Sequence, residues 1–200
     1  MILGEKEITD GRGNRYTLRL GVEVHGAILN DGNVETTVSA IRHVEDGDDI
    51  HLTAVVRLES FARRIAILLP EQEPIHIDIE YFESFADGEG VEVELSEDLD
   101  QGDALGQAAQ DLLDGAGLDE TIEAAIQAMP VPEPAFGCLI KAGVSTTVGQ
   151  LIRCHNCHRR IEQRRRRAWQ IVKCVGINAP GMTIRAALRT LGCWLTLGFL

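Results

Sequence analysis

Two cysteines and a histidine stand close together in the segment RCHNCHRRIEQRRRRAWQIVKC, which covers residues 153–174. Cys154 and Cys157 are three residues apart, and His158 follows the second cysteine directly. Thiolates and imidazoles are ligands that zinc prefers in proteins, and a tetrahedral site needs four of them. The spacing therefore predicts a candidate zinc site at Cys154, Cys157 and His158, with the fourth ligand coming from elsewhere in the fold.

The five letters CHNCH also match the pattern C-x-x-C-H, and they resemble the haem attachment motif of c-type cytochromes. The resemblance implies that Cys154 and Cys157 bind the vinyl groups of the haem and that His158 and Met182 are its axial ligands. It covers these five residues alone, because the surrounding chain does not resemble a cytochrome, so haem is the weaker hypothesis. A third interpretation needs no cofactor: both cysteines are apolar members of a helical stripe, with the histidines at its edge.

The cysteines are confined to one end of the chain. All five lie after residue 137, at positions 138, 154, 157, 174 and 193. Five cysteines form at most two disulfides and leave one thiol, whereas a reducing cytoplasm would keep all five reduced. We predict a disulfide between Cys174 and Cys193 that stabilises a small helical module. Cys154 is predicted to lie about 30 Å from Cys174, because a continuous helix over 154–175 rises about 1.5 Å per residue.

Basic residues crowd the segment that follows the first cysteines. We name them the arginine cluster: Arg159, Arg160, Arg164, Arg165, Arg166 and Arg167, with Trp169 beside them. Arginines next to an aromatic residue can bind nucleic-acid phosphates and stack on bases. A basic helix with an apolar stripe is equally typical of a helix that lies on an anionic membrane. The third alternative is internal, because these arginines could pair with carboxylates of the same chain.

The net charge of −12 conceals a division of charge along the chain. Residues 1–135 carry 30 acidic and 8 basic residues, a net charge of −22. Residues 136–200 carry 1 acidic and 11 basic residues, a net charge of +10. Such an asymmetry predicts either different partners for the two parts or that each part binds the other. We therefore expect intramolecular docking of residues 136–200 on residues 1–135.

Apolar and polar residues alternate along much of the first 95 residues. The alternation is clearest in 16–24, 50–58, 75–81 and 91–95, and Asp-Gly pairs stand between several of these runs. A period of two is typical of half-buried antiparallel strands, and Asp-Gly favours tight hairpins. Residues 1–96 are therefore predicted to form an acidic antiparallel β-meander of about six strands, either a sandwich or a half-open barrel.

The rest of the chain favours helices. Residues 97–129 predict two short acidic helices, broken at the sequence DGAG, with Asp119 as the N-cap of the second. Three prolines at alternate positions mark residues 130–135 as a semi-rigid linker. Residues 136–200 predict a small helical module with a break at GINAPG, residues 176–181. The predicted fold class is therefore α+β, an N-terminal β-meander followed by a small C-terminal helical module.

The last predicted helix, residues 182–199, is apolar on almost every side. We expect it to be buried against other helices, against another subunit in a homo-oligomer, or in lipid. The side chains predicted to make this contact are Ile184, Leu188, Leu191, Trp194, Leu195 and Phe199.

The sequence contains none of the common enzyme motifs: it has no G-x-S-x-G, no Walker A sequence, no H-E-x-x-H and no G-x-G-x-x-G. We therefore predict a protein without catalytic activity. The first 16 residues lack the apolar core of a secretory signal, and no uncharged apolar run reaches 18 residues. The expected location is the cytoplasm, with export of a C-terminal fragment as the alternative.

Three functions are consistent with these features. The favoured one is a two-part precursor or carrier, in which the acidic β-rich segment neutralises a cationic, cysteine-bearing helical module that acts on an anionic membrane as antimicrobial peptides do. The second is an intracellular binding protein whose C-terminal module, with or without zinc, binds nucleic acid or an acidic protein surface. The third is an assembly protein that uses the apolar last helix.

Overall fold

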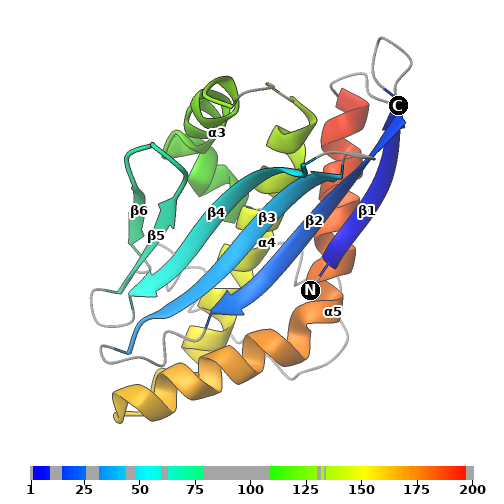
Figure 1. The fold of residues 1–200 in the computed structure, drawn as a ribbon. Helices are drawn as coiled ribbons and strands as arrows, with labels where there is room; N and C mark the ends of the chain where they lie inside the picture. The colour runs from blue at the N-terminus through cyan, green and yellow to red at the C-terminus, as the bar shows by residue number, and fades with distance from the viewer. Residues whose placement is uncertain are drawn as a thin grey trace.

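The structure, a computed structural model, describes residues 2–9, 15–25, 32–43, 48–59, 63–78, 109–129, 132 and 134–196. Within them, six strands form one antiparallel sheet in chain order (Figure 1). The strands are β1 (Ile2–Thr9), β2 (Arg15–His25), β3 (Val34–His43), β4 (Ile50–Glu59), β5 (Arg64–Leu68) and β6 (Ile75–Asp78). The predicted antiparallel β-meander is confirmed, and its predicted last strand, at 91–95, lies outside the described residues.

The alternation in β4 shows why the chain forms this sheet. Every second residue from Leu52 to Leu58 is buried, whereas the residues between them are partly exposed. Successive side chains of a strand point to opposite faces, so one face of the sheet is covered and the other is more open to solvent. On the more open face, Arg57 Nε donates a hydrogen bond of 2.6 Å to Glu35, its cross-strand partner in β3.

The helices that the structure describes follow the sheet along the chain. They are α3 (Leu118–Gln127), α4 (Ala135–His158) and α5 (Arg164–Thr196), preceded by a helical stretch at 109–115. Gly117, with a φ of 84°, takes the left-handed conformation between that stretch and α3. The predicted break at DGAG is therefore confirmed. The N-cap, however, is Gly117, and Asp119 lies in the first helical turn instead.

α5 runs without a break through residues 176–181, where the sequence predicts one. Pro180 lies inside the helix and cannot donate a backbone hydrogen bond to the Gly176 carbonyl. Nearby, the Asn178 side chain donates a hydrogen bond of 2.8 Å to the Cys174 carbonyl. The predicted break is therefore wrong. A single proline bends a helix without ending it when other contacts hold the two halves. α5 accordingly changes direction in this region (Figure 1).

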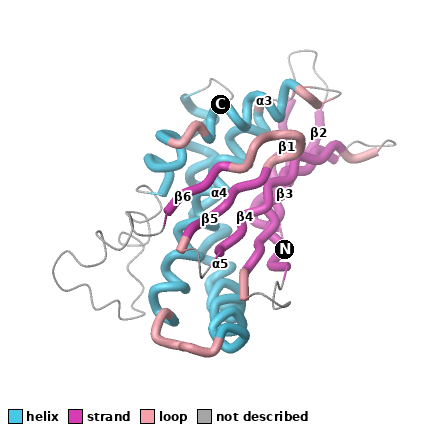
Figure 2. Tube along the Cα trace, turned by 90° about the vertical axis from the view of Figure 1, so that its left-hand side faces the viewer, coloured by secondary structure: helices cyan, strands magenta, loops and turns pink. Residues whose placement is uncertain are grey.

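The helices cover one face of the sheet (Figures 1 and 2). α4 contacts β3 and β4, and α5 contacts β1. A single cluster of buried apolar side chains connects these elements, with Val38 and Leu58 from the sheet, Leu118 from α3, Ile140 from α4 and Ala186 from α5. The α+β fold class is confirmed, and residues of the acidic and basic parts of the chain share one core.

Candidate functional site

α4 and α5 form a helical hairpin whose turn covers residues 159–163. The Ile161 amide donates a hydrogen bond to the His158 carbonyl, and Arg167 Nε donates one of 2.7 Å to the Ile161 carbonyl. The chain reverses at this turn, so α4 ends at His158 and α5 begins at Arg164. The continuous helix predicted over 154–175 is therefore wrong. The turn lies at one end of the molecule, beyond the ends of the strands (Figure 2).

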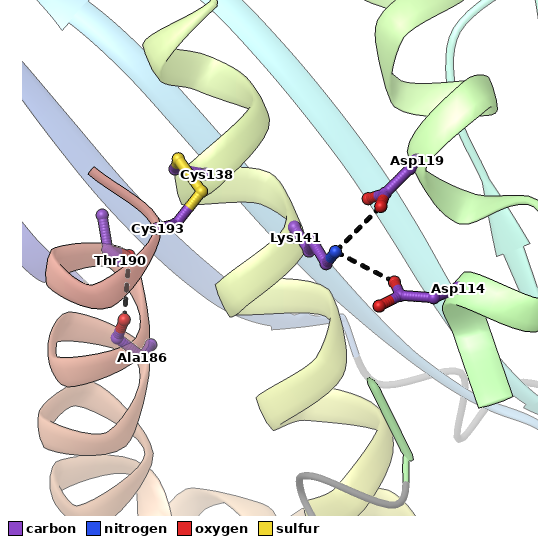
Figure 3. Close-up of a disulfide and its surroundings, with 7 residues drawn as sticks. All are labelled: Asp114, Asp119, Cys138, Lys141, Ala186, Thr190 and Cys193. Carbon is purple, nitrogen blue, oxygen red and sulfur yellow. Dashed lines mark hydrogen bonds and ion pairs between the residues drawn. A yellow bond between two sulfur atoms is a disulfide. The ribbon is translucent and has the colours of Figure 1, made fainter. Parts of the chain in front are cut away.

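Two disulfides join α4 to α5. Cys138 is bonded to Cys193 with a Cα–Cα distance of 5.7 Å, and Cys154 to Cys174 with one of 5.8 Å. Figure 3 shows the first of these bonds between the two helices. The fifth cysteine, Cys157, is exposed and has a free thiol. The arrangement reaches the limit of two disulfides and one thiol that the odd number of cysteines sets.

The predicted disulfide between Cys174 and Cys193 is wrong. Both residues lie in α5, where a continuous helix separates them by about 28 Å at 1.5 Å per residue. Their partners come from α4, which runs antiparallel beside α5. The turn at 159–163 likewise brings Cys154 next to Cys174, a pair that a straight helix would have kept about 30 Å apart.

The disulfide at Cys154 bears on the predicted metal site. Cysteine binds zinc as a thiolate and haem vinyl groups as a thiol, and Cys154 offers neither while its bond to Cys174 is intact. Met182, the second axial ligand that the cytochrome resemblance implies, is buried in the core. Across the residues that the structure describes, no group of three or more His, Cys, Asp or Glu side chains could hold a metal ion. A zinc site at Cys154, Cys157 and His158 therefore requires reduction of the disulfide and stays a prediction.

The structure brings the arginine cluster together at the hairpin turn. Arg159 and Arg160 lie in the turn itself, and the other four arginines form the first turn of α5. All are exposed except Arg167, which is partly buried. Trp169 follows them in α5 and exposes 53% of its surface. The cluster therefore presents positive charge and an accessible indole at one end of the molecule.

α5 carries apolar side chains on its solvent side as well as on its core side. The exposed ones recur at spacings of three, four and seven residues, which places them on one face of the helix. Two exposed basic residues continue this face toward the hairpin turn. We name the set the outer face of α5: Arg166, Lys173, Ile177, Ile184, Leu188 and Leu191. The outer face is cationic toward its N-terminal end and apolar toward its C-terminal end.

Three of the residues predicted for the last helix lie on this outer face and are exposed rather than buried against the chain. Trp194 and Leu195 belong to α5, but their side chains lie outside the described part of the structure, as does all of Phe199. The sequence reasoning missed Ile177, because it placed a break there. Its spacing of one heptad from Ile184 is the signal that could have found it.

α4 is buried far more completely than α5. In the described part of the chain it is the one helix long and apolar enough to cross a membrane, and 89% of its most apolar window is buried inside the protein. A buried core helix of a soluble protein passes the same test of length and apolarity. The sheet, α3 and α5 surround it.

Lys141 links α4 to the acidic segment before it. Its Nζ donates a hydrogen bond of 2.9 Å to Asp119 Oδ2 and lies 3.1 Å from Asp114 Oδ1 (Figure 3). Burial lowers the pKa of Lys141, but hydrogen bonding to Asp119 and Asp114 and their negative charges outweigh it, so the pKa is raised above its ordinary value of 10.5. The lysine is therefore charged at neutral pH and faces two carboxylates.

No family model, curated protein or solved structure matches this chain. The features of the chain that bear on function are those of the hairpin. Its three distinctive properties are closure by two disulfides, the arginine cluster at its turn and the outer face of α5.

Proposed function

We propose that the chain is a non-enzymatic two-part precursor or carrier. Its acidic β-rich part covers a cationic helical hairpin, and the hairpin acts on anionic membranes once it is released. The observation that supports this best is the position of the disulfides, because both join α4 to α5 and neither reaches the rest of the chain. A cut before α4 would leave the hairpin covalently closed but no longer bonded to the sheet.

The segment before α4 suits such a cut. Residues 130–135 hold prolines at three alternate positions, and Pro132 and Pro134 are exposed. Proteolysis concentrates in exposed segments whose backbone makes few hydrogen bonds. After the cut, the hairpin would be held by non-covalent contacts alone, among them the shared core and the ion pairs of Lys141.

Release would expose the apolar surface of α4. The helix has 24 residues, which span about 36 Å at 1.5 Å per residue, and the hydrocarbon core of a bilayer is about 30 Å thick. Between Lys141 and Arg153 the helix has no charged residue, and long basic side chains near helix ends can reach the lipid headgroups. Lipid could therefore replace the sheet as the apolar environment of α4.

The arginine cluster would direct the released hairpin to anionic lipids. Each basic residue close to an anionic membrane surface contributes about 1 kcal/mol of attraction. Residues 136–200 carry 11 basic residues and one acidic residue. In the intact chain, the 30 acidic residues of 1–135 reduce this attraction. Separation of the two parts therefore favours membrane binding in two ways. It removes the acidic residues that weaken the attraction, and it exposes apolar surface.

The arginine cluster by itself also fits an intracellular protein that binds nucleic acid, because arginines and the exposed Trp169 could contact phosphates and bases. That function gives no role to the apolar residues of the outer face of α5. It also gives no role to the two disulfides, which persist in oxidising compartments and are rare in the cytosol. The disulfides therefore favour export of the hairpin. Nucleic-acid binding is the alternative function, and an experiment has to distinguish it from membrane binding.

A controlled cut in the linker tests the proposal. Residues 130–134 are replaced by the recognition sequence of a site-specific protease, and the oxidised protein is mixed with dye-filled vesicles that contain or lack anionic lipid. We expect the cut protein to release dye from the anionic vesicles and the uncut protein to release far less. Protein with the natural linker, treated with the same protease, is the matched control.

Reduction of the disulfides provides a second control, because an open hairpin is expected to release less dye than a closed one. The proposal is wrong if the cut, oxidised protein leaves anionic vesicles intact. Salt-sensitive binding of the cut protein to DNA or RNA, without dye release, would support the nucleic-acid hypothesis instead.

A further inference from the structure

We infer that the intact, uncut chain docks on an anionic lipid membrane through the outer face of α5. This inference rests on the proposed function for the class of its target. Docking itself needs neither the cut nor the insertion of α4, since every residue of the outer face is already exposed in the folded chain. The intact protein would thus reach the membrane before the hairpin is released.

The exposed apolar residues of α5 favour contact with a surface outside the chain. Among the described residues, all the exposed large apolar side chains lie on α5. Ile177 exposes 68% of its surface, Ile184 55%, Leu188 62% and Leu191 40%. They extend over about 21 Å of helix at 1.5 Å per residue. Single exposed apolar residues are ordinary, but an aligned row of four marks a surface that contacts something outside the chain.

The basic residues of the outer face favour an anionic surface. Arg166 and Lys173 are exposed on the same face, and Trp169 lies beside them. Cations bind anionic headgroups, apolar side chains enter the layer beneath them, and tryptophan favours the boundary between the two. Because the Debye length is about 8 Å at physiological salt, the acidic part of the chain repels the membrane only where its side chains come close. The outer face therefore matches the surface of an anionic bilayer.

Other occupants fit this face less well. A second copy of the chain would set like charges opposite each other in a parallel arrangement, and basic residues against apolar ones in an antiparallel arrangement. A nucleic acid would contact the basic half alone and leave Ile184, Leu188 and Leu191 in water. An anionic bilayer satisfies both halves with one surface.

The test is co-sedimentation of the intact, oxidised protein with vesicles of phosphatidylglycerol and phosphatidylcholine, compared with vesicles of phosphatidylcholine alone. We expect binding to the anionic vesicles without dye release. Tryptophan fluorescence should shift to the blue, because both tryptophans of the chain lie in α5. The triple variant Ile184→Gln, Leu188→Gln, Leu191→Gln should bind at least about tenfold more weakly, because it removes most of the apolar half.

Charge variants supply the matched controls. Replacing Arg166 and Lys173 by Gln should weaken binding at low salt by about tenfold or more. Arg15→Gln removes an exposed arginine of β2, outside α5, and should leave the binding unchanged. The triple apolar variant changes exposed positions alone, so its thermal unfolding should match that of the wild type and show that weaker binding does not come from misfolding.

Full binding by the triple apolar variant would overturn the inference. So would a wild-type dimer that the triple variant does not form, because a second copy would then be the occupant. Nucleic-acid binding without membrane binding would overturn it as well. The proposed function is tested separately, by dye release from the cut protein, so either proposal can fail while the other holds.

Discussion

α4 and α5 are joined by two disulfides and share one core, yet they differ in what surrounds their apolar residues. α4 buries 89% of its most apolar window between the sheet and the neighbouring helices. α5 buries Ile171, Val175 and Ala186 on its inner side, while Ile177 and Leu188 stay in solvent on its outer side. In α4 the apolar side chains are therefore mostly buried, whereas α5 has apolar side chains that the rest of the chain does not cover.

Buried apolar residues stabilise the fold, whereas exposed apolar residues are available for contacts outside the chain. A buried apolar side chain stabilises the folded state, so a polar or smaller replacement destabilises it. An exposed apolar side chain contributes little to stability. Variants in α4 should therefore lose folding, and variants on the outer face of α5 should lose membrane binding.

The largest expected effect comes from a charge placed in the buried helix. Val148 of α4 has an exposed fraction of 0%, so Val148→Asp should lower the free energy of unfolding by about 5 kcal/mol or more and abolish cooperative unfolding. Leu188→Asp on the outer face of α5 is the matched control and should change it by less than about 0.5 kcal/mol. Urea unfolding followed by circular dichroism measures both. Equal losses would contradict the difference between the two helices.

The two disulfides should stabilise the hairpin to different extents. Cys138–Cys193 joins residues 55 positions apart, and Cys154–Cys174 joins residues 20 positions apart. From loop-closure entropy, the first disulfide stabilises the folded state by about 4 kcal/mol and the second by about 3 kcal/mol. Replacing the first pair by serines should therefore lower the free energy of unfolding more than replacing the second. Urea unfolding without reductant measures the order, with Cys157→Ser, which removes a free thiol, as the control. A reversed order would mean that local packing, rather than loop closure, decides the stability.

The strands were predictable to the extent that their side chains alternate. β4 alternates over its whole length, and the sequence predicts it directly. In β3 the alternation is interrupted in the middle of the strand, because Thr37 is buried between the buried Thr36 and Val38. Thr36 Oγ1 donates a hydrogen bond of 3.3 Å to the Val56 carbonyl, which allows a polar side chain at a core position. The hydrogen bond exists only in the assembled sheet, so a reading of β3 alone could not reveal its strand character.

The hairpin was harder to predict, because local signals point to the wrong place. Glycine and proline are the strongest breakers in sequence rules, yet α5 passes through Pro180 and the turn at 159–163 contains neither residue. The prediction of Cys174 with Cys193 is wrong for the same reason, because it assumed a break at 176–181 that α5 does not have. The arginine cluster was predictable, because its members are neighbours in the sequence. Its place at the tip of the hairpin was not.

The smallest expected effect concerns the contact between α4 and the acidic segment. The Lys141 side chain is 20% exposed and faces Asp114 and Asp119. Lys141→Met keeps the apolar stem but removes the charge, so it should lower the free energy of unfolding by about 1 kcal/mol. Lys173→Met, on the exposed outer face of α5, is the matched control and should change it by less than about 0.5 kcal/mol.

The pH dependence of this difference identifies its source. The pKa of Lys141 is raised above 10.5 in the folded chain, so the unfolded chain loses this proton at a lower pH than the folded chain does. From neutral pH up to pH 10.5 the ion pairs therefore stabilise the fold fully, and their contribution disappears as the pH rises through the higher folded-state pKa. The difference in the free energy of unfolding between wild type and Lys141→Met, measured by urea unfolding, should stay constant between neutral pH and pH 10.5 and shrink above it. A difference that persists at higher pH would show that Lys141 joins α4 to the acidic segment by packing, and that charge does not hold the two parts of the chain together at this point.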